Sequence, residues 1–199
     1  MPYTLHAPCA LARATVAALL LAAGATQAVE LEFASTSDAA AWQVAVARPG
    51  VDGELSSFQT SGFVQASAIA GRASEGIGWI ANNTSGSNGC CVGDWTFFVF
   101  RQTFDLTGHD PATAVLRFRW AADDSGQGFA DRGRWKPKYT LNGGELVVGV
   151  WPGDESYGFG SEVVISSGFT AGLNTIDFYV QGNGITDGFA LDARGLSAV

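Results

Sequence analysis

The sequence predicts an all-β protein, either a sandwich or a barrel, and three observations lead to this fold class. Ten or eleven short strand-like stretches are separated by Gly, Asn, Asp or Pro at nearly regular spacing. Glycine supplies 26 of the 199 residues, and charged residues make up 15% of the chain, against a usual share of about 25%. No helical periodicity of useful length follows residue 42.

The first predicted elements are short. Val29–Phe33 alternates apolar and acidic residues, as a half-buried strand does. The stretch Ser37–Ala41 is suited to a single capped helical turn. Trp42–Val46 returns to strand character, and Phe63–Ile69 and Ile77–Ala81 are the next predicted strands.

The strongest predicted strand is Trp95–Phe104. Its first half is apolar on both faces and its second half alternates, which predicts a central strand that emerges toward a sheet edge. Ala114–Trp120 places large apolar residues on one face, and Arg117 and Arg119 on the other. The remaining predicted strands are Tyr139–Leu141, Leu146–Val150, Glu162–Ile165, Leu173–Val180 and Gly188–Leu191. Because no linker, repeat or low-complexity stretch interrupts residues 29–199, we expect one domain there.

Residues 1–28 have the parts of a secretory signal peptide. Arg13 gives a weakly positive front, Ala14–Ala25 is an almost unbroken apolar run, and Thr26 and Ala28 are small residues at positions −3 and −1 of a cut. The alternative is a membrane anchor, but the run of 12 residues is short of the roughly 20 that span a bilayer. We therefore expect cleavage after Ala28 and a secreted protein without a membrane span, either extracellular, associated with the cell surface or periplasmic.

Charge and histidine content limit the function classes. Arg13 is the only charged residue in the predicted leader, so the mature chain would carry a net charge of −9 instead of −8. This balance disfavours a nucleic-acid partner, because no basic surface can form. His109 would be the single remaining histidine, which excludes a zinc site with two histidines and leaves only this residue for a Ser-His-Asp triad. It lies in a predicted turn, Gly108–Pro111.

The mature chain would keep only two cysteines, the adjacent Cys90 and Cys91. They cannot connect distant strands, and they are too few for a structural zinc site. In an oxidising compartment we favour a bond between the two over free thiols or pairing with another chain.

Six motifs occur in an order that is similar to a known group of proteins. They are Trp79–Asn83, Phe98–Gly108, Asp110–Ala114, Arg119–Gly126, Leu141–Gly144 and Gly168–Val180. The series resembles exported β-sandwich proteins of Gram-negative bacteria, many of which carry a PEP-CTERM sorting tail. More distantly it is similar to the galactose-binding-like jelly roll, as in the sugar-binding domain of β-galactosidases. The resemblance covers about residues 77–195 and implies an antiparallel β-sandwich of the jelly-roll type.

The chain departs from this group at its end, where residues 194–199 contain no Pro-Glu-Pro motif, apolar helix or basic cluster. We therefore expect release, or retention by binding, and not anchoring through such a tail.

Acidic residues gather in two predicted loops. Asp123, Asp124 and Asp131 lie in one, and Asp154 and Glu155 lie in the other. Three interpretations apply to them: solvated turn residues, hard oxygen ligands for Ca²⁺, or a catalytic carboxylate pair. The resemblance implies a structural Ca²⁺, although its ligands are unknown and no EF-hand spacing is present.

The tryptophans divide into two groups. Four have strand-like surroundings and are predicted core residues: Trp42, Trp79, Trp95 and Trp120. Trp135 and Trp151 lie in predicted loops and are candidate sugar platforms, since a pyranose ring stacks its apolar face on an aromatic ring. The alternative for these two is an aromatic residue that covers the rim of the sandwich.

The leading hypothesis is a secreted, non-catalytic domain that binds carbohydrate or extracellular matrix, with an extracellular polysaccharide as partner. The candidate binding residues are Trp151, Trp135, Asp154, Tyr157, Asp123 and Asp124. A second hypothesis is a structural or adhesive matrix protein without a small ligand. A third is a glycan hydrolase with a carboxylate pair.

Overall fold

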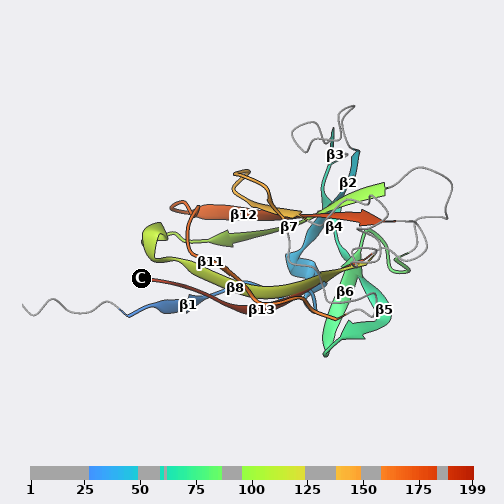
Figure 1. Cartoon of the computed structure of the whole chain (residues 1–199), viewed down its shortest axis with the longest axis horizontal. Helices are drawn as coiled ribbons and strands as arrows, with labels where there is room; N and C mark the ends of the chain where they lie inside the picture. The colour runs from blue at the N-terminus through green and yellow to red at the C-terminus, as the bar shows by residue number, and fades with distance from the viewer. Residues whose placement is uncertain are drawn as a thin grey trace, which may run out of the picture.

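The computed structural model describes residues 27–48, 59–60, 62–86, 96–123, 138–148, 158–182 and 188–199. These residues form two antiparallel sheets that pack against each other (Figure 1). The predicted antiparallel β-sandwich is therefore confirmed, and the barrel alternative is not the one observed. Among the described residues, no helix is long and apolar enough to cross a membrane.

Six strands form sheet A, in the order β11-β8-β13-β6-β5 with β1 also paired to β13. Their bounds are β1 Val29–Leu31, β5 Ser67–Ser74, β6 Ile77–Ala81, β8 Val115–Ala122, β11 Val163–Ile165 and β13 Phe189–Ala198. The middle strand is β13, which pairs with β8 along one side and with β6 and β1 along the other.

Seven strands form sheet B, in the order β10-β9-β12-β7-β2-β3 with β4 also paired to β2. Their bounds are β2 Gln43–Arg48, β3 Gln59–Thr60, β4 Val64–Gln65, β7 Thr96–Asp105, β9 Lys138–Leu141, β10 Val147–Val148 and β12 Leu173–Gly182. Two short 3₁₀ helices complete the described fold, η1 (Ala39–Ala41) and η3 (Pro111–Thr113).

Aromatic rings from both sheets meet in the core. Phe178 of β12 lies 4.9 Å from the ring centre of Phe189 on β13 and 5.2 Å from that of Trp120 on β8. Trp42 and Trp120 are 0% and 2% exposed, so their predicted core positions are confirmed. Trp95 lies outside the described residues.

Trp79 is also buried, but in a separate cluster. Its neighbour Ile80 points into the main core, whereas Trp79 packs with Ile69, Ala121 and Ala190. Because side chains alternate between the two faces of a strand, this second cluster lies on the outer face of sheet A.

Most predicted strands are present, with three differences. β13 continues to Ala198, well beyond the predicted end at Leu191, through a register shift between Ala193 and Gly195. Gly195 has φ +136° there, which glycine adopts readily, and the polar residues around it hide the strand pattern. The predicted single strand Phe63–Ile69 is wrong, because the chain passes at Ala66 from β4 in sheet B to β5 in sheet A, and β5 extends to Ser74. The two-residue strand β3 was not predicted.

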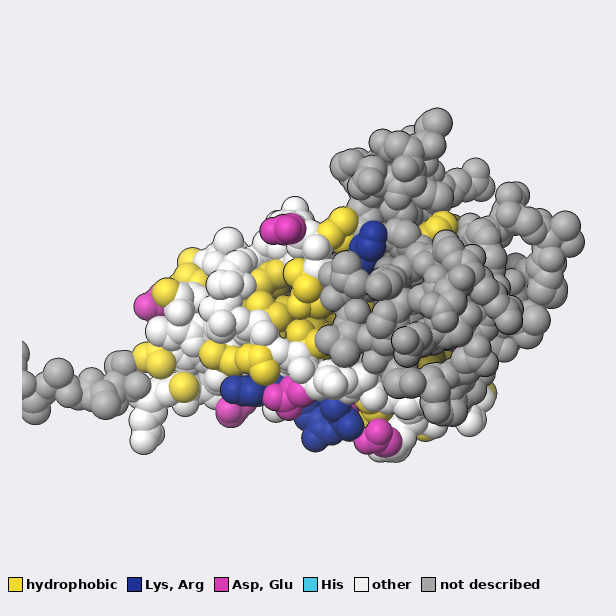
Figure 2. All heavy atoms as spheres, in the orientation of Figure 1, with side chains coloured by type: hydrophobic (Ala, Val, Ile, Leu, Met, Phe, Trp, Pro, Cys, Tyr) yellow, Lys and Arg dark blue, Asp and Glu magenta, His cyan; other side chains and the backbone are white. Residues whose placement is uncertain are grey.

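Charged side chains are concentrated on the side of sheet A. Figure 2 shows Lys or Arg and Asp or Glu side chains intermingled there, with hydrophobic side chains in a band between the two sheets. The two predicted arginines of β8 contribute to this surface, since Arg117 pairs with Glu162 and Arg119 pairs with Glu75 and Asp192. The predicted alternation of β8 is confirmed.

Candidate functional site

One of the predicted binding residues, Asp123, belongs to the described part of the chain. The others, and both cysteines of the predicted disulfide, lie outside the described residues: Trp135, Trp151, Asp124, Asp154, Tyr157, Cys90 and Cys91.

Asp123 follows directly after β8 and makes structural contacts. Its Oδ2 lies 2.8 Å from Nη2 of Arg72, and both side chains are about six-sevenths buried, at 15% and 14% exposure. Its N–H donates to the carbonyl of Gly188 at 2.9 Å, and the Arg72 guanidinium lies 4.6 Å from the ring centre of Trp79. These contacts fix the start of the loop after β8, and a role of Asp123 in ligand binding stays a prediction.

The strand ends that adjoin the predicted loops of sheet B lie together. Thr96, where β7 begins, is paired with Gly182, where β12 ends. Lys138, where β9 begins, is paired with Tyr179 of β12 and with Val148, where β10 ends.

The end of β8 in sheet A lies at this same end of the sandwich. β7 and β8 are joined by residues 106–114 at the opposite end of the sandwich, so the last residues of β8 lie at the end where β7 begins. Asp123 is therefore rooted at the same end as Lys138 and Val148.

The pairing of Lys138 with Val148 is central to the candidate site. Trp135 precedes Lys138 by three residues, and Trp151 follows Val148 by three residues. The described residues nearest in sequence to the two predicted platforms are thus paired with each other on neighbouring strands. The sequence predicted loops around both tryptophans, but it did not predict that Lys138 and Val148 pair with each other.

Near Lys138 and Val148, aromatic and charged side chains contact one another on the outer face of sheet B. Arg101 of β7 binds Asp177 of β12 through two hydrogen bonds of 2.7 Å, Nε to Oδ1 and Nη2 to Oδ2. The Phe63 ring centre lies 3.9 Å from the Arg101 guanidinium carbon. The hydrogen bonds to Asp177 raise the pKa of Arg101 above its ordinary value.

Tyr179 extends this group toward the loop-bearing end. Its ring packs on the cluster of Phe97 and Val99, and burial raises the pKa of its hydroxyl. Phe63 and Tyr179 were not singled out from the sequence, although the alternation of Asp177 and Tyr179 in β12 does indicate that both share the outer face.

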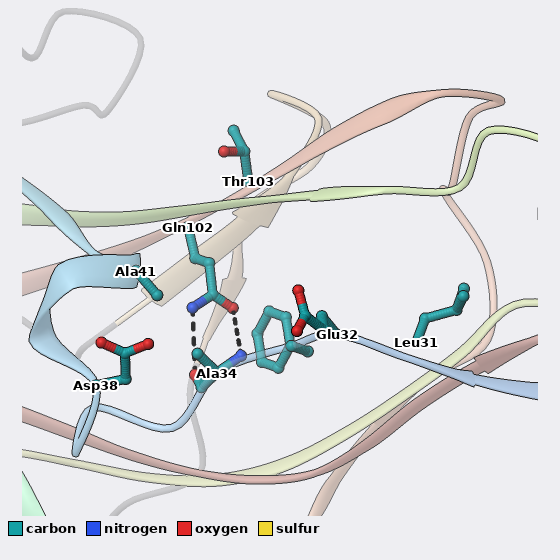
Figure 3. A pocket seen from close by; sticks show the side chains of 8 residues that line it. Leu31, Glu32, Ala34, Asp38, Ala41, Gln102 and Thr103 are labelled. Atoms are coloured by element: carbon teal, nitrogen blue, oxygen red, sulfur yellow. Dashed lines mark hydrogen bonds between the residues drawn. The ribbon is translucent and has the colours of Figure 1, made fainter.

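A pocket of about 610 Å³ opens elsewhere, between β7 and the chain that follows β1. It is lined by Leu31, Glu32, Phe33, Ala34, Asp38, Ala41, Gln102 and Thr103. Figure 3 shows the Gln102 amide crossing from β7 to the backbone of Ala34, where Nε2 donates to the carbonyl at 3.2 Å and Oε1 accepts from the N–H at 3.1 Å. This amide closes the interior of the sandwich behind the pocket.

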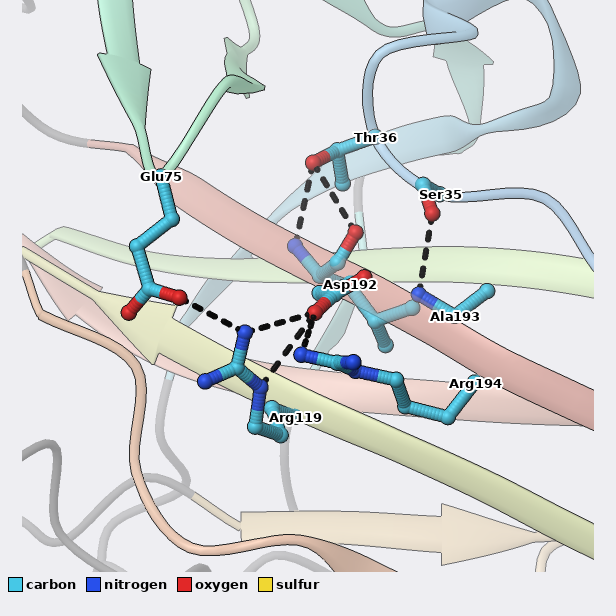
Figure 4. A network of polar contacts seen from close by, with 8 residues as sticks. Ser35, Thr36, Glu75, Arg119, Asp192, Ala193 and Arg194 are labelled. Atoms are coloured by element: carbon cyan, nitrogen blue, oxygen red, sulfur yellow. Dashed lines mark hydrogen bonds and ion pairs between the residues drawn. The ribbon is translucent and has the colours of Figure 1, made fainter.

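Charged groups on the outer face of sheet A form a linked network (Figure 4). Nη2 of Arg119 lies 2.8 Å from both Oε2 of Glu75 and Oδ2 of Asp192, and Nη2 of Arg194 lies 2.7 Å from the same Asp192 oxygen. Hydrogen bonds to Asp192, and secondarily to Glu75, raise the pKa of Arg119. The network ties β8, β13 and the β5–β6 turn together.

The predicted calcium site is not located by the described residues. Within them, no group of three or more His, Cys, Asp or Glu side chains is arranged to hold a metal ion. Asp124, Asp131, Asp154 and Glu155, on which that prediction rests together with Asp123, lie outside the described residues.

Comparison with known proteins adds no relative. No protein-family model matches the chain, and no curated protein matches it significantly.

Proposed function

We propose that this protein is a secreted, non-catalytic β-sandwich domain that binds an extracellular polysaccharide or a carbohydrate of the surrounding matrix. The observation that carries the proposal is the pairing of Lys138 with Val148, which are the described residues nearest in sequence to Trp135 and Trp151. Two aromatic residues within three positions of one paired couple are suited to contact neighbouring sugar rings.

The chemistry of the surrounding residues agrees with this use. A pyranose ring has an apolar face that stacks on an indole ring, while its hydroxyl groups need hydrogen-bonding partners. Asp154 and Tyr157 follow Trp151 within the same segment, and Asp124 follows the fixed Asp123. The rigid outer face of sheet B, with Arg101 and Asp177 locked together, provides a stable base for such loops.

The position of the first described strand agrees with the proposed export. β1 begins at Val29, directly after the predicted cleavage position at Ala28. Removal of residues 1–28 would therefore leave every described strand intact.

The test is a glycan array with the mature protein, followed by calorimetric titration of each glycan that binds. Trp151→Ala and Trp135→Ala are each expected to weaken binding by about 1–3 kcal/mol, the scale of a lost aromatic anchor. Leu173→Ala is the matched control, because Leu173 is 73% exposed and lies at the far end of β12.

The outcomes separate the three hypotheses. An array without any bound glycan would favour the structural or adhesive matrix protein. Glycan cleavage that is lost in Asp124→Asn would favour the hydrolase. A Trp151→Ala variant with normal binding and a large loss of stability would place Trp151 in the core, and Trp135 would then be the remaining platform.

A further inference from the structure

β7 has one fully paired side and one side that is only partly paired. β12 pairs with it from Thr96 to Asp105, whereas β2 pairs with it only from Phe97 to Arg101. The sequence pattern of a central strand that emerges toward an edge predicts this change, and the pairing confirms it. The half of β7 from Gln102 to Asp105 is thus a sheet edge on the β2 side.

The hydrogen-bonding pattern between β7 and β12 shows which backbone groups of β7 face the unpaired side. The N–H of Leu106 donates to the carbonyl of Gly172 at 2.9 Å, so the even-numbered residues of β7 face β12. The backbone N–H and C=O groups of Thr103 and Asp105 therefore face the side on which β2 has ended.

η1 takes the chain away from the position where β2 would continue. Since Gln43 pairs with Arg101, an extended β2 would place Ala41 opposite Thr103. Instead, Ala41 lies in η1 and donates its N–H to the carbonyl of Asp38 at 3.1 Å. The pocket described above occupies the position that a continued β2 would fill.

Two carboxylates and several apolar side chains line the pocket. Among the eight described residues that line it, Glu32 and Asp38 are the charged ones, and none is Lys or Arg. Figure 3 shows the Glu32 carboxylate pointing toward β7, with Leu31 in the same segment. Phe33 anchors the floor by packing edge-on against Phe104, at 5.6 Å between ring centres.

We propose that this open edge binds an extended basic peptide by strand addition, independently of the carbohydrate site. A peptide residue opposite Thr103 would exchange both backbone hydrogen bonds with it. Its side chain would share the outer face with Thr103, and the neighbouring peptide side chain opposite Phe104 would point inward to Glu32. Lys or Arg at this inward position matches the exposed carboxylates of Glu32 and Asp38, because opposite charges attract at low salt.

The test uses a blocked, fluorescently labelled peptide of sequence Thr-Lys-Thr-Lys-Thr and the mature protein, with binding measured by fluorescence anisotropy at low salt. N-methylation of the backbone nitrogens of the three Thr residues removes the N–H donors that would face β7. N-methylation of the backbone nitrogens of the two Lys residues blocks the opposite edge of the same peptide and serves as the matched control. The first change is expected to weaken binding roughly tenfold, by the loss of at least one net hydrogen bond, and the second to leave it within about twofold.

A protein variant tests the charge contribution. Glu32→Gln is expected to weaken binding by roughly two- to fivefold, the scale of one exposed ion pair. Glu145→Gln changes an exposed carboxylate that does not line the pocket, and it should leave binding unchanged.

Several results would overturn the proposal. These are the absence of saturable binding up to millimolar peptide, equal weakening by the two sets of N-methyl groups, or equal effects of Glu32→Gln and Glu145→Gln. Sedimentation that shows a stable dimer to which the peptide does not bind would also overturn it, because a second copy would then occupy the edge. A negative glycan array would leave this proposal unaffected.

Discussion

Replacing Phe178 by alanine is expected to cause one of the largest losses of stability in the protein. The side chain is fully buried at the contact between the two sheets. Its ring centre lies within 6.0 Å of those of five other aromatic residues, which are Trp42, Phe118, Trp120, Tyr139 and Phe189. Removal of the ring leaves a cavity that these large neighbours cannot easily fill.

The magnitude follows from the burial. A buried Phe→Ala change costs about 3–5 kcal/mol, and the five ring contacts place Phe178 near the upper end of that range. A domain of this kind has a free energy of unfolding of about 5–15 kcal/mol, so Phe178→Ala would remove about a quarter of it or more. For a chain of this size, a loss of about 4–5 kcal/mol lowers the melting temperature by roughly 8–20 °C.

The assay is urea denaturation of the mature protein, followed by tryptophan fluorescence and circular dichroism. Phe178→Leu keeps most of the buried volume and is expected to lose only about 1–2 kcal/mol, so it gives a measurable transition if the alanine variant does not fold. Leu173→Ala on the same strand should stay within about 0.5 kcal/mol of the wild type, because Leu173 is 73% exposed. A loss below about 1 kcal/mol for Phe178→Ala would refute the central position of this ring.

Three further predictions concern export, the cysteines and pH. The intact mass of the secreted protein should correspond to a chain that begins after Ala28, and a product that keeps residues 1–28 would defeat the export argument. Peptide mapping without reduction should find Cys90 and Cys91 in one peptide that is about two daltons lighter than its reduced form, and two alkylatable thiols in fresh protein would contradict the bond. Burial raises the pKa of the Tyr139 hydroxyl above its usual value, so the folded state keeps this proton longer than the unfolded state. The resulting stability is complete below about pH 10 and decreases as the pH rises above it; this decrease should be smaller in Tyr139→Phe, and an unchanged alkaline profile would contradict it.

The sequence was informative where local alternation determines the structure. In β8 the large apolar residues and the arginines occupy opposite faces as predicted, because a half-buried strand needs this pattern. The change of pattern within β7 also marked the point where its neighbour β2 ends. Both features depend on residues that are close in sequence.

Features that depend on distant contacts could not be predicted in this way. The pocket needs Glu32 beside Thr103, and its closure needs the amide of Gln102 to reach Ala34, 68 residues away in the chain. The interpretation of Trp79 as a core residue was correct about burial but could not distinguish the interior from the outer face of sheet A. That distinction depends on Arg72, which covers the indole ring.

The position of β13 has a consequence for the order in which the protein can fold. Sheet A joins residues 29–31, 77–81 and 115–122 through contacts with residues 189–198. Before those residues leave the ribosome, β1 and β6 lack their shared partner, and the strands already synthesised cannot complete the sheet. Because such long-range pairing makes folding slow, sheet A should stay incomplete until residues 189–198 have been synthesised. That delay agrees with the proposed export, in which the chain would cross a membrane before it folds.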